Sequence, residues 1–269
     1  MTQASTAGLR RDIADFTRTD PVFGGVGKPV LRLGEHGPAV IVLHEIYGFT
    51  PAVARLCRWI AAAGFRVYVP VLLGSPDAGN ADTVGAGRIL HLCISREFAL
   101  FAADKASPVV DWLKPLARAA HAECGGLGVG VIGMCLTGGF GLAMAVDPSV
   151  MAPVLSQPST PVTKHAALPI APGDLAAVKA RVANGLQIRG LRFAGDKLAR
   201  QQRFDALADA LGPGFEGQVL PDTSGHPQGF RAQGKPPHSV LTGDLVDAPG
   251  ELTRAAVDDL LAWFGERLR

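Results

Sequence analysis

Short apolar segments alternate with helical segments along this chain, and that alternation constrains the fold more than any other feature. Six runs rich in Val, Ile and Leu have the length and composition of strands buried on both faces, at residues 38–45, 65–72, 128–134, 151–157, 190–195 and 217–221. Strands that alternate with helices are typical of a mostly parallel sheet. We therefore predict an α/β fold in which helices cover both faces of a mostly parallel central sheet.

Helical periodicity fills most of the intervals between these runs, at residues 51–64, 95–105, 136–145, 174–185, 200–212 and 251–268. Gly64 suits the C-terminal cap of the first helix, while Ser107 and Pro108 suit the N-cap and first position of another. Cys57 shares one face with Val, Leu and Ile side chains, which predicts core packing for it. The last helix has apolar residues three and four apart, so it should dock on the sheet.

A chain of 269 residues with no repeat and no low-complexity linker is expected to form a single domain over residues 1–269. Residues 1–30 precede the first predicted strand and are expected to form a partly irregular N-terminal extension. Residues 74–87, 158–173 and 221–237 are rich in Gly and Pro and are predicted loops. Loops at the carboxyl ends of parallel strands are the usual ligand-binding positions in such sheets.

Charge and cysteine content exclude several classes of function. The formal net charge is +2 and no stretch concentrates Lys and Arg, so neither nucleic-acid nor membrane-surface binding is expected. The apolar runs are too short to span a bilayer, and the polar N-terminus is not a secretory signal. No CxxC pair or His at zinc-ligand spacing occurs, so we expect a soluble cytoplasmic protein with reduced thiols. The four cysteines are Cys57, Cys93, Cys124 and Cys135.

The heptapeptide GMCLTGG, residues 133–139, lies at the turn between a predicted strand and a helix. A cysteine among glycines at such a junction is typical of the nucleophile elbow, a sharp turn that lifts a side chain clear of the sheet. The helix N-terminus favours the thiolate of Cys135, and the N–H of Leu136 is placed to hold a developing oxyanion. Thr137 stands where the common pattern has glycine. The motif by itself therefore leaves a buried structural cysteine as an equal alternative.

A thiol nucleophile needs a base, and the base needs an orienting acid. In doubly wound hydrolases these partners follow the nucleophile, first the acid and then the histidine. Asp196 directly follows one predicted strand, and His238 follows the next strand and a long loop. His226 on the same loop is the rival histidine, and either one taken alone also fits an exposed loop residue. Asp205 and Asp209 are alternative acids, but they lie within a predicted helix, where a solvated face is expected.

The first predicted strand ends in His44 and Glu45. A carboxylate at the carboxyl end of an inner strand is costly to bury unless something pairs with it. One interpretation is that Glu45 caps the loop or meets an arginine. The other is that it faces Cys135, beside a backbone N–H of Ile46 that completes the oxyanion hole. We expect His44 to support this loop rather than to catalyse.

Four separated motifs, LHEIYG, GMCLTGG, GDKLARQQRFDAL and HSVL before the terminal amphipathic helix, together resemble the dienelactone hydrolase family from about Val40 onward. Each motif is weak alone, but their order and spacing are fairly specific. The resemblance implies an α/β-hydrolase fold, a Cys-His-Asp triad and hydrolysis of an enol lactone, without a metal or organic cofactor. It also implies a residue that helps to activate the thiol when substrate binds. The matching residues are Cys135 as nucleophile, Asp196 as acid, His238 as base, Glu45 as the activating residue, and Ile46 and Leu136 as backbone oxyanion donors.

Several positions depart from the family pattern. Thr137 replaces a glycine, and Asp196 follows its preceding glycine immediately, whereas the family often leaves two residues between them. Thr242 stands four residues after the predicted base, where the dienelactone enzymes carry an arginine that holds the substrate carboxylate. A second family arginine has two candidates here, Arg88 and Arg96. Tyr47 and Arg96 are the predicted substrate-binding residues.

The sequence thus predicts a carboxylic ester or lactone hydrolase that uses a thioester acyl-enzyme. Its only predicted partner is a small-molecule ester or lactone substrate, and the sequence leaves monomer and homodimer open. A non-catalytic relative that binds a small molecule in the same pocket is the alternative. A thiol redox protein is a third interpretation, but no resolving cysteine lies near Cys135 in the sequence.

Overall fold

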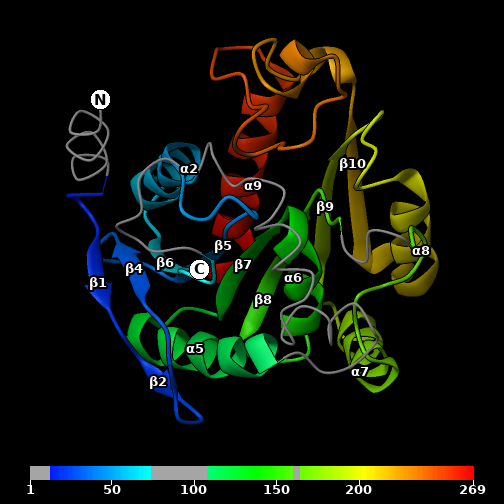
Figure 1. Cartoon of the computed structure of the whole chain (residues 1–269). Coiled ribbons are helices and arrows are strands. Elements are labelled where there is room, and N and C mark those ends of the chain that lie inside the picture. The colour runs from blue at the N-terminus through cyan, green and yellow to red at the C-terminus, as the bar shows by residue number, and fades with distance from the viewer. Residues whose placement is uncertain (1–12, 74–107, 160–163) are drawn as a thin grey trace.

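The computed structural model describes residues 13–73, 108–159 and 164–269, which are built around an eight-stranded sheet (Figure 1). Six neighbouring strands, β5 to β10, run parallel to one another, while β4 pairs antiparallel with β6 and β1 pairs antiparallel with β4 at one edge. This arrangement confirms the predicted mostly parallel sheet. In spatial order the strands are β1 (Thr17–Thr19), β4 (Val30–Leu33), β6 (Arg66–Pro70), β5 (Ala39–Leu43), β7 (Val129–Met134), β8 (Val150–Ser156), β9 (Ile188–Phe193) and β10 (Phe215–Leu220).

All six predicted strands are present, shifted by a few residues at their ends. The sequence did not reveal β1, β4 or the small hairpin of β2 (Val22–Phe23) and β3 (Val26–Gly27). These strands are two to four residues long, and β1 has the polar sequence TRT. Such short segments carry too few side chains to show a period-2 pattern. Within the predicted N-terminal extension, residues 13–30 therefore contribute strands, and residues 1–12 lie outside the described part.

Helices cover both faces of the sheet, as predicted. Strand β5 shows why, because Val40 and Val42 pack toward α2 and α9 while Ile41 and Leu43 pack toward α5, and all four are fully buried. On the second face α6 and α8 also pack, with α7 beside them. The helices are α2 (Pro51–Ala62), α5 (Pro108–Cys124), α6 (Gly138–Met144), α7 (Pro172–Ala183), α8 (Gln201–Leu211) and α9 (Leu252–Leu268).

Helix α2 illustrates how local sequence sets the boundaries of an element. The Thr50 hydroxyl accepts a hydrogen bond from the Val53 N–H at 3.3 Å, and Pro51 takes the first helical position. Gly64 follows the helix with a φ of +86°, a conformation that favours glycine. Cys57 lies on the apolar face and is fully buried, as predicted, and this burial raises the pKa of its thiol far above the usual value.

Some predicted features lie outside the described residues. They are the loop at residues 74–87, the helix at 95–105 and Cys93. Helix α5 does begin at Pro108, as the sequence predicted. Among the residues that the structure describes, no helix combines the length and apolar character needed to cross a bilayer.

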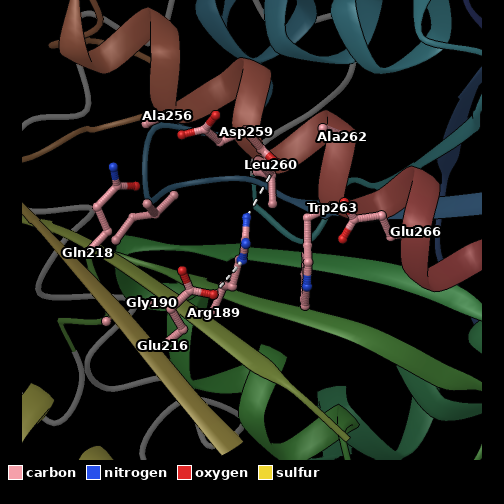
Figure 2. Close-up of a pocket in the computed structure, with 12 residues that line it drawn as sticks. Arg189, Gly190, Glu216, Gln218, Ala256, Asp259, Leu260, Ala262, Trp263 and Glu266 are labelled. Atoms are coloured by element: carbon pink, nitrogen blue, oxygen red, sulfur yellow. Dashed lines mark hydrogen bonds and ion pairs between the residues drawn. The ribbon is translucent and has the colours of Figure 1, made fainter.

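A groove of about 420 Å³ lies between α9 and the strands β9 and β10 (Figure 2). Arg189 fills its centre, with Nε 3.1 Å from a Glu216 carboxylate oxygen and Nη1 donating to the Asp259 carbonyl at 3.3 Å. The guanidinium also lies over the Trp263 ring, 4.8 Å from its centroid. None of the predicted site residues lines this groove, so we place the candidate site elsewhere.

Candidate active site

The order of the central strands defines where a ligand site is expected. From β5 the chain passes to β6 on one side, and it later returns to β7 on the other side of β5. A crevice outside the carboxyl ends of strands forms at such a topological switch point. Glu45 and Ile46 follow β5, and Cys135 and Leu136 follow β7, so both predicted halves of the site leave the sheet at this point.

Cys135 occupies a sharp turn, a 3₁₀ segment from Cys135 to Thr137 that joins β7 to α6. Its φ is +55°, a left-handed conformation that non-glycine residues adopt rarely and at a cost in strain. The neighbouring glycines permit this turn. A Cβ on Gly133 would lie 2.4 Å from the Thr137 carbonyl oxygen, and one on Gly138 would lie 2.6 Å from the Cα of Pro158.

The Cys135 thiol is 8% exposed and contacts a residue that the sequence did not suggest. Its Sγ lies 3.4 Å from the hydroxyl oxygen of Ser159, and the Ser159 N–H donates to the Cys135 carbonyl at 3.1 Å. Ser159 follows β8, which is the neighbour of β7 in the sheet. The only available signal was its position just beyond the carboxyl end of a predicted strand, in a segment read as loop.

His238 and Asp196 lie side by side although 42 residues separate them. His238 Nδ1 is 2.7 Å from Asp196 Oδ2. The other carboxylate oxygen accepts the N–H groups of Leu198 and Ala199, at 2.8 and 3.1 Å. Because both oxygens have partners, Asp196 is fixed and holds the imidazole in one orientation.

The alternative candidates lie elsewhere. The Nδ1 of His226 accepts the N–H of Gln228 at 3.2 Å, and its own backbone N–H donates to the Asp244 carbonyl. Asp205 and Asp209 are exposed on α8, as the sequence suggested for helical carboxylates. The structure therefore brings Asp196 together with His238. It places neither Asp205 nor Asp209 beside either histidine.

Burial and two neighbouring residues set the protonation of His238. Burial is the largest influence and lowers the pKa of the imidazole, but the interactions with Cys135 and with Asp196 outweigh it. The net effect raises the pKa of His238 well above its usual value. Its Nε2 atom is buried and has no hydrogen-bond partner within the described residues. In many enzymes the hydrogen bond between a catalytic base and its nucleophile forms fully only when substrate binds.

Asp244 holds the loop that carries His238, and sequence reasoning missed it. One of its oxygens accepts the N–H groups of His238 and Ser239, at 2.8 and 3.0 Å. The other accepts the N–H of Phe230 at 2.9 Å. The residue is fully buried, so these three bonds compensate for removing the carboxylate from water. A carboxylate six residues beyond the predicted base was the only sequence signal for this role.

Glu45 is buried and is held by two neutral side chains. Its Oε1 accepts from the Gln157 amide at 2.8 Å, and its Oε2 accepts from the Thr242 hydroxyl at 3.0 Å. Gln157 has a φ of +35°, and its amide oxygen accepts from the Ser156 hydroxyl and from the Val240 N–H. Thr242, which occupies the position of a family arginine, thus binds this carboxylate. The sequence suggested neither partner of Glu45.

His44 and Tyr47 flank Glu45 in the chain and differ in role. His44 Nδ1 lies 2.8 Å from the Glu45 carbonyl oxygen and its Nε2 accepts the Leu72 N–H at 3.0 Å, so the ring supports the loop. Burial lowers the pKa of His44 to about 4. For Tyr47, which is half-buried, burial and then the negative charges of Cys135, Glu45 and Asp244 raise the pKa of the hydroxyl. Arg88 and Arg96 lie outside the described residues.

Comparison with solved structures defines the fold. A dienelactone hydrolase from Anabaena variabilis aligns over 95% of this chain and 100% of its own, at 17% identity and a TM-score of 0.58. A dienelactone hydrolase-like promiscuous phosphotriesterase from metagenomic libraries aligns over 94% and 98%, at 18% identity and a TM-score of 0.64. A cold-adapted esterase from an Arctic intertidal metagenomic library aligns over 94% and 93%, at 15% identity and a TM-score of 0.59. The fold is that of an α/β-hydrolase.

The family follows from the sequence. The model of the dienelactone hydrolase family matches residues 27–173, more than half of the chain. A search of curated proteins gives no match. The chain belongs to the dienelactone hydrolase family, a family of hydrolases.

Proposed function

We propose that this protein hydrolyses small carboxylic esters or lactones, with Cys135 as nucleophile, His238 as base and Asp196 as orienting acid. The observation that carries the proposal is the His238–Asp196 pair. Asp196 binds Nδ1 at 2.7 Å, and the opposite ring nitrogen is buried and without a hydrogen-bond partner in the described part of the chain. The charge of Cys135 contributes to the raised pKa of His238. A base with an oriented ring beside a thiol is the requirement for covalent acyl transfer.

In the first half-reaction, the Cys135 thiolate attacks the carbonyl carbon and the carbonyl oxygen becomes an oxyanion. The backbone N–H groups of Ile46 and Leu136 hold this oxyanion. When the carbon–oxygen bond to the leaving group breaks, His238 donates its proton to the departing alkoxide. The product of this step is a thioester on Cys135 and a free alcohol, which remains tethered to the acyl group if the substrate is a lactone.

In the second half-reaction, neutral His238 removes a proton from a water molecule that attacks the thioester. The same two N–H groups hold the second oxyanion, and the Cys135 thiolate leaves as the carboxylic acid forms. The proton taken from water stays on His238, which restores the starting pair. A reducing cytoplasm, which the cysteine pattern of the sequence predicts, keeps the thiol available for this cycle.

Four further side chains have supporting roles in the proposal. Ser159 donates its hydroxyl hydrogen to the Cys135 thiolate, for which the 3.4 Å contact is the support. Glu45 assists activation of the thiol only after one of its present bonds, to Gln157 or to Thr242, has opened. Tyr47, half-buried beside this cluster, contacts the substrate. Arg96 remains a predicted substrate contact from the sequence.

The test is turnover of p-nitrophenyl esters and small lactones by the wild type, by Cys135→Ala and by Cys124→Ala as the matched control. Cys124 is a half-buried cysteine at the end of α5. We expect Cys135→Ala to lose at least about 10⁴-fold in kcat, because it removes the nucleophile, and Cys124→Ala to retain activity. Full activity in Cys135→Ala would show that the triad is assigned wrongly.

Alkylation separates the hydrolase from the non-catalytic alternative. An activated Cys135 should react with iodoacetamide below pH 8, ahead of the other cysteines, as peptide mapping of the labelled protein would show. Unselective labelling together with no ester turnover would instead support a small-molecule-binding protein.

A further inference from the structure

Thr137 is the residue by which the GMCLTGG turn departs from the glycine of its family, and its hydroxyl is fully engaged. The side chain is completely buried. Its Oγ1 accepts the N–H of Met134 at 3.0 Å. The same oxygen lies 2.9 Å from the Leu43 carbonyl and 3.1 Å from the His44 carbonyl, with the Met134 carbonyl also at 2.9 Å, so its one hydrogen can be donated to any of these.

The Thr137 hydroxyl lies where the pairing between β5 and β7 ends. Strands β5 and β7 are paired up to Leu43 and Gly133, the last pair of their register. Beyond that pair the ladder between β5 and β7 ends, although Met134 of β7 still pairs with Ser156 of β8. The Thr137 hydroxyl lies at this point, within hydrogen-bond distance of the Leu43 carbonyl at the end of β5 and of the His44 carbonyl just beyond it.

The two proposed oxyanion donors lie just beyond the same point, Ile46 after β5 and Leu136 after β7. No strand pairing fixes the spacing between their N–H groups. We propose that Thr137 is a positioning residue that sets this spacing by a side-chain link that glycine cannot make. The inference rests on the proposed hydrolase function and adds a role for a residue in this chain.

The expected effect follows from the geometry that an oxyanion hole needs. Donors must lie about 2.7–3.1 Å from the oxyanion, and loss of one donor costs about 10²–10³-fold in kcat. A displaced donor should cost less than a missing one. We therefore expect removal of the Thr137 hydroxyl to lower kcat by about 10-fold to 100-fold and to change KM little.

The matched variants are Thr137→Ser and Thr137→Ala, which both remove the methyl group and differ only in the hydroxyl. Thr137→Val, which keeps the side-chain shape, is a second variant without the hydroxyl. For each we would measure kcat and KM on an activated ester, the rate of Cys135 alkylation by iodoacetamide, and thermal unfolding. Alkylation displaces iodide at a saturated carbon and forms no oxyanion, so it reports on the thiol independently of the oxyanion hole.

If Thr137 positions the donors, the Ala and Val variants lose kcat, the Ser variant keeps it within about threefold, and all alkylate at the wild-type rate. Equal losses in turnover and alkylation would overturn the inference, because Thr137 would then act on the thiol or on the whole turn. Equal kcat in the Ser and Ala variants would overturn it as well. Failure of the proposed hydrolase function is a separate outcome, seen when wild type and Cys135→Ala turn over esters equally.

Discussion

His44 and His238 are both buried at the carboxyl edge of the sheet, yet their pKa values move in opposite directions. Among the described residues the His44 ring has only backbone partners, the Glu45 carbonyl and the Leu72 N–H, and burial lowers its pKa to about 4. His238 is as deeply buried, but Asp196 and the charge of Cys135 raise its pKa well above the usual value. The charge of the partners, rather than depth, therefore decides which form of a buried imidazole is stable.

The two histidines therefore differ in role: His44 holds the backbone around it in place, whereas His238 can accept and donate a proton. A neutral His44 satisfies the Glu45 carbonyl beyond the end of β5 and the Leu72 N–H beyond the end of β6, and so keeps the two segments together. The acid beside His238 makes a positive charge on the ring tolerable, which a general base requires after it has accepted a proton. Three experiments test this contrast.

The largest effect is expected from Asp196→Asn, which replaces the charged hydrogen-bond partner of the His238 ring by a neutral amide. The amide cannot compensate a positive imidazole, and it can hold the ring in the wrong tautomer. We expect kcat/KM for an activated ester to fall by about 10³–10⁴-fold, the order of loss for this replacement in a serine-protease triad. Asp205→Asn, on the exposed face of α8, is the control and should stay near wild type. A loss below tenfold in Asp196→Asn would mean that another group orients the base.

An intermediate effect is expected on the pH dependence of stability through His44. In the unfolded chain this side chain binds a proton below about pH 6.5, whereas in the folded protein it does so only near the pKa of about 4. Between these values the unfolded state binds more protons, so the free energy of unfolding falls as the pH falls. The loss over this window is about 3 kcal/mol and is complete only below the folded pKa.

Urea unfolding of wild type and His44→Gln at pH 7, 6 and 5 measures this contribution. A glutamine amide offers one donor and one acceptor, so the variant should fold while losing stability less steeply toward acid pH. His36→Gln removes a histidine whose side chain is 92% exposed and should keep the wild-type slope. Parallel stability curves for wild type and His44→Gln would show that His44 does not titrate with folding.

The smallest effect is expected from Ser159→Ala, which tests whether the thiol beside His238 has a second polar partner. Loss of the hydroxyl removes a hydrogen bond to a charged sulfur, so alkylation of Cys135 at pH 6.5 should slow by about tenfold. Ser149→Ala also removes a buried hydroxyl, bonded to Asp147 at 2.7 Å, and provides the control. An alkylation rate in Ser159→Ala equal to that of the control would leave Ser159 without a role at the thiol.

The sequence predicted those features that depend on order along the chain. The alternation of apolar runs and helices places Asp196 and His238 after successive strands, and the structure joins them at 2.7 Å. The burial of Cys57 also followed, because helical periodicity determines which side chains share a face. The first inference uses only the order of strands and helices along the chain, and the second uses only the positions of residues within one helix.

Features that depend on which strands are neighbours were not predicted. Ser159 reaches Cys135 because β8 lies beside β7, and Gln157 reaches Glu45 across the sheet from the same strand end. Thr137 was recognised only as a mismatch, because its bond to Leu43 requires that β5 and β7 be adjacent. Asp244 binds backbone N–H groups, and such contacts leave no side-chain pattern in a sequence.

The Asp244 carboxylate has a consequence for redesigning the protein. It binds the N–H of Phe230 at one end of a loop and those of His238 and Ser239 at the other. Residues 232–235, which lie between these two ends, are exposed. Arg231 is not part of this stretch, because its guanidinium donates to the carbonyls of Thr223 and Gly225. The bonds of Asp244 lie outside residues 232–235, and the closure entropy of a loop grows slowly with its length, so these residues can be replaced or extended while the base keeps its anchor. New ligand-binding segments can therefore be inserted at residues 232–235, next to the site.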